Sequence, residues 1–297
     1  MRTKTLHSKW EWKLIAGDEL ERMNALQFGG YRMQDPTYLA HLERQREAFA
    51  PYIKASMRKT RQGILLDIIR SDAPREIVQQ ALWLYRGFRK GFNALVRMTQ
   101  EENDRLLKEC PAELTDNYLI WSAGDEQYIE ALVEQFGWMH TNESHAYLMK
   151  LATGNVHPLV RAVAINAMAF EDKRFDADFV LGLISHPKTS RRDLYEALYA
   201  IGQHSDRYKG ADYCPAIWPF VKHPDWHIYY EAIRSIHFKY GGRQRLRKYL
   251  ASLKSGPNPD QKRIEEIESY VVGWEYEDAE IAERIKARKE KEMADES

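Results

Sequence analysis

The feature that most constrains the fold of this chain is a small-then-large apolar pair that returns five times in segments of helical periodicity. Successive pairs lie 50, 36, 30 and 35 residues apart, which suits a repeating unit of two short helices with an insertion in the first interval. An alanine in mid-helix lets a neighbouring helix approach closely, so we expect these alanines in the seams between packed helices. The pairs are Ala81-Leu82, Ala131-Leu132, Ala167-Met168, Ala197-Leu198 and Ala232-Ile233.

A His-Pro dipeptide precedes the last three of these segments, at His157, His186 and His223. Proline suits the first turn of a helix, where its missing N–H would have no intrahelical partner. Each dipeptide therefore predicts a turn into the second helix of a hairpin, as in DFVLGLIS, HPKTS and RRDLYEALYAIG. Three metal ligands are not expected, because equivalent positions in stacked helical units lie about 8–10 Å apart. No cofactor is expected either.

Composition narrows the choice of environment and partner. The chain has 297 residues, and 44 basic residues balance 44 acidic ones, so no overall positive field attracts nucleic acid or an anionic membrane. The two cysteines, Cys110 and Cys214, form no disulfide or zinc framework. No secretory segment and no apolar run of membrane-spanning length is visible. We expect a soluble cytoplasmic protein with no membrane partner.

The periodicity of the apolar residues predicts an all-α chain. From Ser8 onward they recur at helical intervals, and runs of period two are almost absent. Glycine and proline fall between the apolar stripes, as expected of helix boundaries. We expect three parts: an N-terminal helical cap over residues 1–60, helical repeats over 61–256, and a C-terminal helix with a flexible charged tail over 257–297. Pro51 is expected to start or kink a helix in the cap.

Three stretches carry a family resemblance: GILLDIIRSDAPREIVQQALWLY, NVHPLVRAVAINAMAF and LGLISHPKTSRRDLYEALYAIG. They resemble HEAT repeats, in which an Asp-Pro-type turn leads into a second helix that begins Val-Arg and ends Ala-Leu. Val160-Arg161 matches the first position, and Arg192 with Glu196-Ala197-Leu198 matches the rest. The resemblance covers about residues 60 to 240 and implies a curved α-solenoid of helical hairpins. It departs from the pattern where His replaces Asp, and no regular repeat can be placed between Phe88 and Asp125.

The first functional hypothesis is a non-catalytic scaffold that binds another protein on the concave face of the second helices. The chain has no Gly-x-Ser-x-Gly elbow, no phosphate-binding glycine loop and no His-Glu pair. The resemblance to HEAT-repeat proteins implies a range of roles that includes adaptors and immunity proteins neutralising bacterial toxins. The expected partner-binding residues are Arg161, Asn166, Arg192, Glu196, Tyr199, Trp226, Tyr230 and Arg234.

The alternative hypothesis is enzymatic, because some alkylpurine DNA glycosylases are also HEAT-like. It would use a cationic groove, a tryptophan such as Trp226, and an acidic residue such as Asp193 or Asp225. The zero net charge counts against it, since several phosphate contacts usually require a basic excess. A bilin-type lyase is a third, weaker alternative. The expected nucleic-acid-binding residues, within KYGGRQRLRKYL, are Arg243, Arg245, Arg247 and Lys248.

Overall fold

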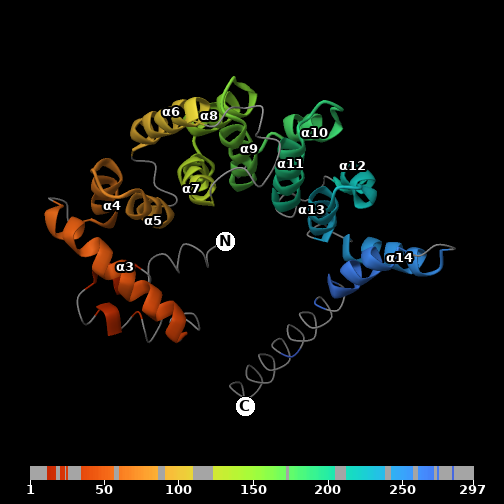
Figure 1. Ribbon diagram of the computed structural model, residues 1–297, viewed down its shortest axis with the longest axis horizontal. Coiled ribbons are helices and arrows are strands. Elements are labelled where there is room, and N and C mark those ends of the chain that lie inside the picture. The colour runs from red at the N-terminus through yellow and green to blue at the C-terminus, as the bar shows by residue number, and fades with distance from the viewer. Residues whose placement is uncertain are drawn as a thin grey trace, which may run out of the picture. The chain divides into compact units, whose positions relative to one another are not determined.

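A computed structural model gives the fold, and every regular element in its described residues is a helix, as predicted (Figure 1). None of these helices combines the length and the apolar character that crossing a membrane requires. The chain divides into two compact units, Met1–Asp176 and Ala177–Ser297. The structure describes residues 12–17, 21–23, 25, 35–56, 60–85, 91–109, 123–171, 174–204, 212–237, 242–256, 260–270, 273 and 283.

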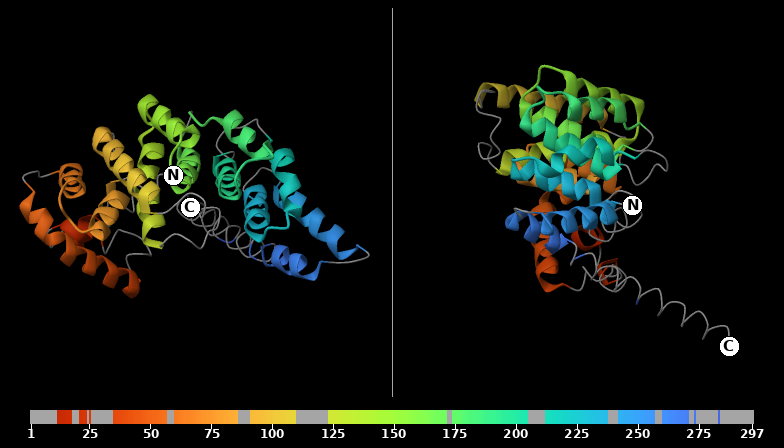
Figure 2. Two further views of the ribbon diagram at one scale, coloured as in Figure 1. Left: turned by 45° about the horizontal axis from the view of Figure 1, so that its top comes forward. Right: turned by 90° about the vertical axis from the view of Figure 1, so that its right-hand side faces the viewer.

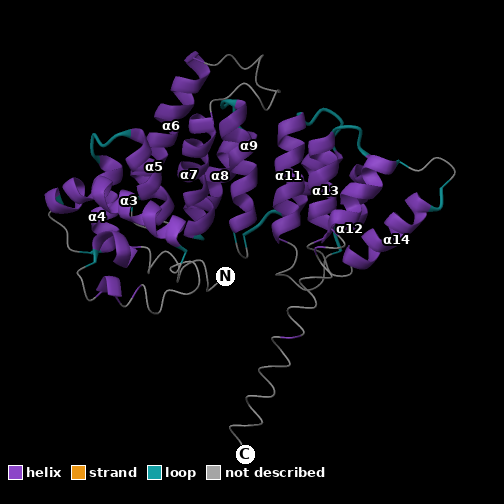
Figure 3. Cartoon of the chain, turned by 60° about the horizontal axis from the view of Figure 1, so that its bottom comes forward, coloured by secondary structure: helices purple, strands orange, loops and turns teal. Residues whose placement is uncertain are grey.

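The first unit is built mainly from helical hairpins (Figure 3). Helix α4 pairs with α5, α6 with α7, and α8 with α9, while the second helices α5, α7 and α9 pack against one another in that order. The hairpin of α6 and α7 falls where the sequence allowed no regular repeat to be placed. The helices are α3 (Pro36–Ala55), α4 (Arg61–Arg70), α5 (Arg75–Tyr85), α6 (Phe92–Glu109), α7 (Ala123–Met139), α8 (Asn142–Thr153) and α9 (Pro158–Ala167), followed by the 3-10 turn η3 (Met168–Phe170).

The second unit repeats the hairpin arrangement. Its second helices α11 and α13 pack side by side (Figure 2). The helix over 261–270 also contacts α13. The guanidinium of its Arg263 lies 4.6 Å from the ring centroid of Tyr229. The elements are α10 (Ala177–Ser185), α11 (Arg191–His204), α12 (Cys214–Ile217), the 3-10 helix η5 (Trp218–Lys222), α13 (Trp226–His237) and α14 (Gly242–Lys254).

The predicted alanine seams are buried in both units. The five alanines of the repeated pairs have no exposed surface, and their large apolar neighbours are at most 1% exposed. Two glycines mark still closer approaches between second helices. A methyl group at Gly137 would lie 2.2 Å from the carbonyl oxygen of Ala167, and one at Gly202 would lie 2.3 Å from Oγ of Ser235. The second helices therefore pack almost backbone to backbone, a geometry that larger side chains would prevent.

The three His-Pro turns share one hydrogen bond. In each, the histidine Nδ1 accepts the backbone N–H of the residue two positions on, at 3.2 Å for His157, 3.2 Å for His186 and 3.1 Å for His223. The ring thus acts like the side chain of an Asx turn, which caps a backbone amide that would otherwise lack a partner. This hydrogen bond explains why histidine recurs at the start of these turns.

Only the first of the three prolines begins a helix. Pro158 is the first residue of α9, and His157 is its N-cap. In the other two turns the helix starts later and a different side chain caps it. Oγ of Ser190 accepts an amide N–H of α11 at 3.1 Å, and Oδ1 of Asp225 accepts two amides of α13 at 2.9 and 3.4 Å. The His-Pro dipeptide therefore marks the turn, and the cap sets where the helix begins.

The N-terminal region contributes one long helix to the first unit. Asp35 caps α3 and accepts the amide N–H groups of Thr37 and Tyr38 at 2.8 and 3.3 Å. Pro51 lies in the interior of α3, so the expectation that it starts a helix is wrong. Oγ of Ser56 donates to Asp67 of α4 at 2.8 Å and ties the end of α3 to the hairpins. The three-part division of the chain stays a prediction, and most of the charged tail lies outside the described residues.

Candidate functional site

The predicted partner-binding residues fall in both units. Arg161 and Asn166 are half-buried on α9 of the first unit. The other six lie on two neighbouring helices of the second unit, where α11 packs against α13. This second group lies on one pair of packed helices, so the candidate site is described there. Its members are Arg192, Glu196 and Tyr199 on α11, and Trp226, Tyr230 and Arg234 on α13.

Two of these six residues form a buried ion pair. Nε of Arg192 lies 2.9 Å from Oε1 of Glu196, and the two side chains are only 6% and 3% exposed. Their spacing of four residues puts them on one face of α11. Because both charges are buried, they do not lie on an exposed binding surface. They instead hold each other inside the packed helices, where loss of one partner would leave an uncompensated charge.

A second ion pair links this interior to the surface. Arg234 Nη1 lies 3.2 Å from Oε2 of the buried Glu231, and its guanidinium stands 5.1 Å from the ring centroid of Tyr199. Burial raises the pKa of Glu231, against the opposing effects of Arg234 and of the hydroxyl of Ser235. That hydroxyl also donates to the carbonyl of Leu198 at 2.7 Å, which joins α13 to α11. The network fixes the two helices relative to each other.

At one end of this network three aromatic rings meet, and we call them the aromatic ledge: Trp226, Tyr230 and Tyr270. The first two rings stack at 4.9 Å, and the rings of Tyr230 and Tyr270 lie 5.7 Å apart. The indole N–H of Trp226 donates to Glu266 at 2.9 Å. Trp226 is 44% exposed, and in the part of the chain that the structure describes only Met23 and Leu107 are also large, apolar and exposed.

Sequence reasoning missed Glu266 and Tyr270. Both follow Gly256, in a stretch that the charge pattern assigned to a separate C-terminal segment. The helix over 261–270 nevertheless docks on the second unit, where the guanidinium of Arg263 donates to the carbonyl of His223, in the turn before α13, at 3.4 Å. One signal could have found this helix. Ile264 and Ile267 are spaced for one helix face, and both are buried.

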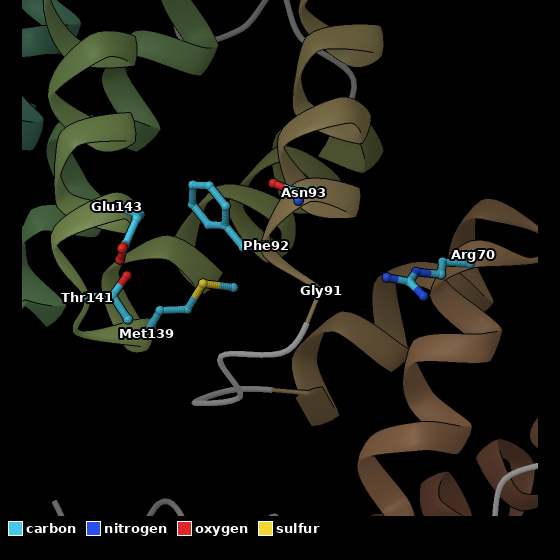
Figure 4. Close-up of a pocket in the computed structure, with 7 residues that line it drawn as sticks. All are labelled: Arg70, Gly91, Phe92, Asn93, Met139, Thr141 and Glu143. Carbon is cyan, nitrogen blue, oxygen red and sulfur yellow. The ribbon is translucent and has the colours of Figure 1, made fainter.

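A hollow of about 470 Å³ lies in the first unit, between the start of α6 and the turn from α7 to α8 (Figure 4). Arg70 points toward it from α4, while Thr141 and Glu143 line the other side. Gly91 at its edge has φ 107°, and a methyl group there would lie 2.7 Å from Cδ1 of Leu66. The lining of the hollow brings together one cation, Arg70, and one carboxylate, Glu143.

Another hollow, of about 480 Å³, lies between two of the His-Pro turns. His186 and His223 line it, together with an ion pair in which Arg191 Nε is 2.5 Å from Oδ2 of Asp225. Burial acts to raise the pKa of Asp225, but the α13 amides and Arg191 outweigh it and hold that pKa below its ordinary value. Asp225, a candidate acid of the glycosylase alternative, thus serves as a helix cap and an ion-pair partner.

The same turns bear on metal binding. Because each Nδ1 accepts a backbone amide, the neutral ring carries its proton on Nε2, which then has no lone pair to give to a metal. Within the described ranges, no group of three or more His, Cys, Asp or Glu side chains is placed to hold a metal ion. The histidines that the sequence repeats are accounted for by backbone capping.

The predicted nucleic-acid residues lie along α14. Arg243 and Arg245 are half-buried, whereas Arg247 and Lys248 are exposed. Arg245 is held by both carboxylate oxygens of Asp212, at 3.2 and 2.7 Å. The Arg245 guanidinium holds the pKa of Asp212 below its ordinary value.

Functional assignment must come from the geometry of the chain itself. Comparison of the sequence and fold with protein-family models, with curated proteins and with solved structures finds no match.

Proposed function

We propose that this protein is a non-catalytic scaffold that binds another protein across the second helices of a HEAT-like α-solenoid. The support is the recurrence of hairpins whose second helices pack on one another through alanine seams, as in repeat proteins. The observation that carries the proposal is the aromatic ledge, where Trp226 stays exposed although two helices hold its ring.

The ledge has the chemistry of an interface anchor. Tryptophan and tyrosine bury a large area on binding and have few rotatable bonds, which is why they are enriched among residues that dominate binding energy. The ring of Trp226 is already fixed by stacking on Tyr230 and by its hydrogen bond to Glu266. A partner would therefore meet an ordered surface and avoid the entropy loss of immobilising a free side chain.

The buried ion pairs give this surface its rigidity. Glu231 and Arg234 lie directly beside the ledge on α13, and Arg192 with Glu196 is buried on α11. Such networks fix helix register when all members are satisfied. On the resemblance to HEAT repeats we further propose a cytoplasmic adaptor or an immunity protein that neutralises a bacterial toxin. In both roles the scaffold blocks or positions a second protein without chemistry of its own.

The test is affinity capture from cells of the source organism, followed by mass spectrometry, with and without nuclease. Three baits are compared: the wild-type chain, Trp226→Ala and Leu107→Ala. The leucine variant is the matched control, because Leu107 is 43% exposed and thus resembles Trp226 in exposure and apolarity. A stoichiometric protein captured by the wild type and the control but lost with Trp226→Ala supports the proposal.

Two results would argue against the proposal that the aromatic ledge binds a protein. A partner retained equally by all three baits would remove the ledge from the interface. Partners that vanish with nuclease would favour the glycosylase alternative, which is then tested by release of free methylated adenine from alkylated DNA. Loss of that release in Asp193→Asn or Asp225→Asn, in variants that melt like the wild type, would establish the enzyme, and no release at micromolar protein would end that alternative.

A further inference from the structure

A third cavity, of about 460 Å³, lies in the second unit beside α14. Its walls come from α12 and η5, which adjoin in the chain, and from the more distant α14; α12 provides Cys214 and Pro215. The 3-10 helix η5 provides Trp218 and Lys222, and α14 provides Arg245, Lys248, Tyr249 and Ser252. We call it the basic cleft. It shares no residue with the aromatic ledge, and the proposed scaffold function does not use it.

The charges of the basic cleft do not cancel. Arg245 is compensated by Asp212, whose two carboxylate oxygens it contacts. Lys222 and Lys248 are exposed, and no carboxylate among the described residues forms an ion pair with either ammonium group. Among the described residues, no carboxylate balances these two positive charges of the cleft, and a phosphate monoester near neutral pH carries a matching charge.

The remaining wall of the cleft is aromatic. The rings of Trp218 and Tyr249 pack edge to face, with centroids 5.6 Å apart and planes at 71°. The hydroxyl of Tyr249 donates to the carbonyl of Val221 at 3.4 Å, which keeps the buried tyrosine in place. Trp218 is only partly buried, so its ring can receive a second flat ring by stacking. Cations beside an aromatic wall suit a ligand that is both phosphorylated and aromatic.

We propose that the basic cleft binds a nucleoside phosphate, with the phosphate on Lys222 and Lys248 and the base against Trp218. The volume lies within the range of about 300–1,000 Å³ that is usual for sites of small organic ligands. Ser252 also lines the cleft; its hydroxyl donates to the carbonyl of Tyr249 at 2.7 Å, so toward the ligand it can act as an acceptor. This assigns a small-molecule site to a chain whose proposed partner is a protein.

Binding is measured on the full chain by displacement of a fluorescent ADP analogue with ADP, inorganic phosphate or a single-stranded oligonucleotide. We expect saturable ADP binding that weakens about tenfold in Lys222→Ala and in Lys248→Ala, since each removes one charge-assisted contact. Arg247→Ala is the matched control: it removes an exposed cation of the same helix that does not line the cleft. It should leave the affinity unchanged. Trp218→Leu should weaken ADP more than it weakens inorganic phosphate.

Several outcomes would overturn the proposal. No saturable binding of ADP by the wild type up to millimolar concentration would do so. Unchanged affinity in both Lys222→Ala and Lys248→Ala, in variants that melt like the wild type, would also do so. Phosphate that competes as well as ADP would reduce the cleft to a simple anion site. An oligonucleotide that competes better than ADP, with an equal loss in Arg247→Ala, would show that α14 follows a nucleic-acid backbone. Protein capture through Trp226 is independent of all these results, so the two proposals fail separately.

Discussion

The indole of Trp226 stacks on the ring of Tyr230 one turn further along α13, with centroids 4.9 Å apart and planes at 25°. Its N–H donates in the same geometry to Glu266 of the helix over 261–270, at 2.9 Å. One exposed ring is thus held by contacts from two helices. Most exposed aromatic side chains would lose rotamer freedom on binding, whereas this ring has already lost it.

The first prediction concerns this hydrogen bond. Glu266→Ala should weaken partner binding by about 3- to 10-fold, because the indole loses one of its two restraints. Glu266→Gln keeps an acceptor oxygen at the same position and should bind almost as well as the wild type. The measurement is calorimetric titration with the captured partner. Equal affinities for the alanine and glutamine variants would show that the hydrogen bond does not preorganise the ring.

Removal of the histidine cap should cost more stability at His157 than at His186, although the two hydrogen bonds are alike. His157 is fully buried, whereas His186 is exposed. His157→Ala should therefore lower the free energy of unfolding by about 2–4 kcal/mol, through loss of the cap and an unfilled cavity. His186→Ala should cost about 1 kcal/mol or less. Urea denaturation measures both.

A further variant separates the two contributions at His157. Asparagine places an acceptor at the same distance from the backbone as Nδ1, so His157→Asn should recover the capping part of the loss but leave the cavity. An asparagine variant as unstable as His157→Ala would mean that the cap contributes little and that packing of the ring dominates.

Substitution of two helical glycines should have opposite effects. Gly202→Ala should destabilise the protein by about 1–3 kcal/mol, because the new methyl group would overlap Ser235 across the seam of α11 and α13. Gly182→Ala is the matched control on α10, since no atom lies within 4 Å of its new methyl group. It should stabilise by up to about 1 kcal/mol, the difference in helix propensity. Thermal unfolding of both variants should shift in opposite directions, and a shift of the same sign would contradict the close approach.

A pH-dependent prediction follows from Glu171. Its side chain is fully buried with Nδ1 of His145 at 3.0 Å, and burial raises its pKa above the ordinary 4.5 although His145 opposes this. The folded state therefore holds this proton more tightly than the unfolded state. Its contribution to stability is fully present below about pH 4.5 and is lost as pH rises through the folded-state pKa.

Glu171→Gln removes this dependence because the amide does not ionise. Below the ordinary pKa of 4.5, the difference in stability between the variant and the wild type should stay constant. As pH rises from there to 7, the variant should gain stability relative to the wild type. Chemical denaturation at several pH values measures this difference. If the wild type instead gained stability relative to the variant as pH rises, the ion pair with His145 would outweigh burial.

The hairpins were largely predictable because their signals are local. Helical spacing of apolar residues, mid-helix alanines and a His-Pro turn gave the hairpin of α10 and α11 close to its observed bounds. The surroundings of the proposed binding residues were less predictable. Arg192 and Glu196 stand four residues apart, as in a solvated surface pair, and only the packing of neighbouring helices shows that they are buried. The same holds for Glu266, whose contact with Trp226 spans 40 residues.

The seams at Gly137 and Gly202 also bear on how such a chain changes in evolution. Each seam places one glycine against one close neighbour on the next second helix, Ala167 or Ser235, so the packing of adjacent hairpins depends on a few positions. Duplication or deletion of a whole hairpin would still leave a small residue at each contact between neighbouring second helices. A single residue inserted into a second helix would rotate every later side chain by about 100° and break these contacts. Such a lineage would be expected to lengthen or shorten by whole hairpins.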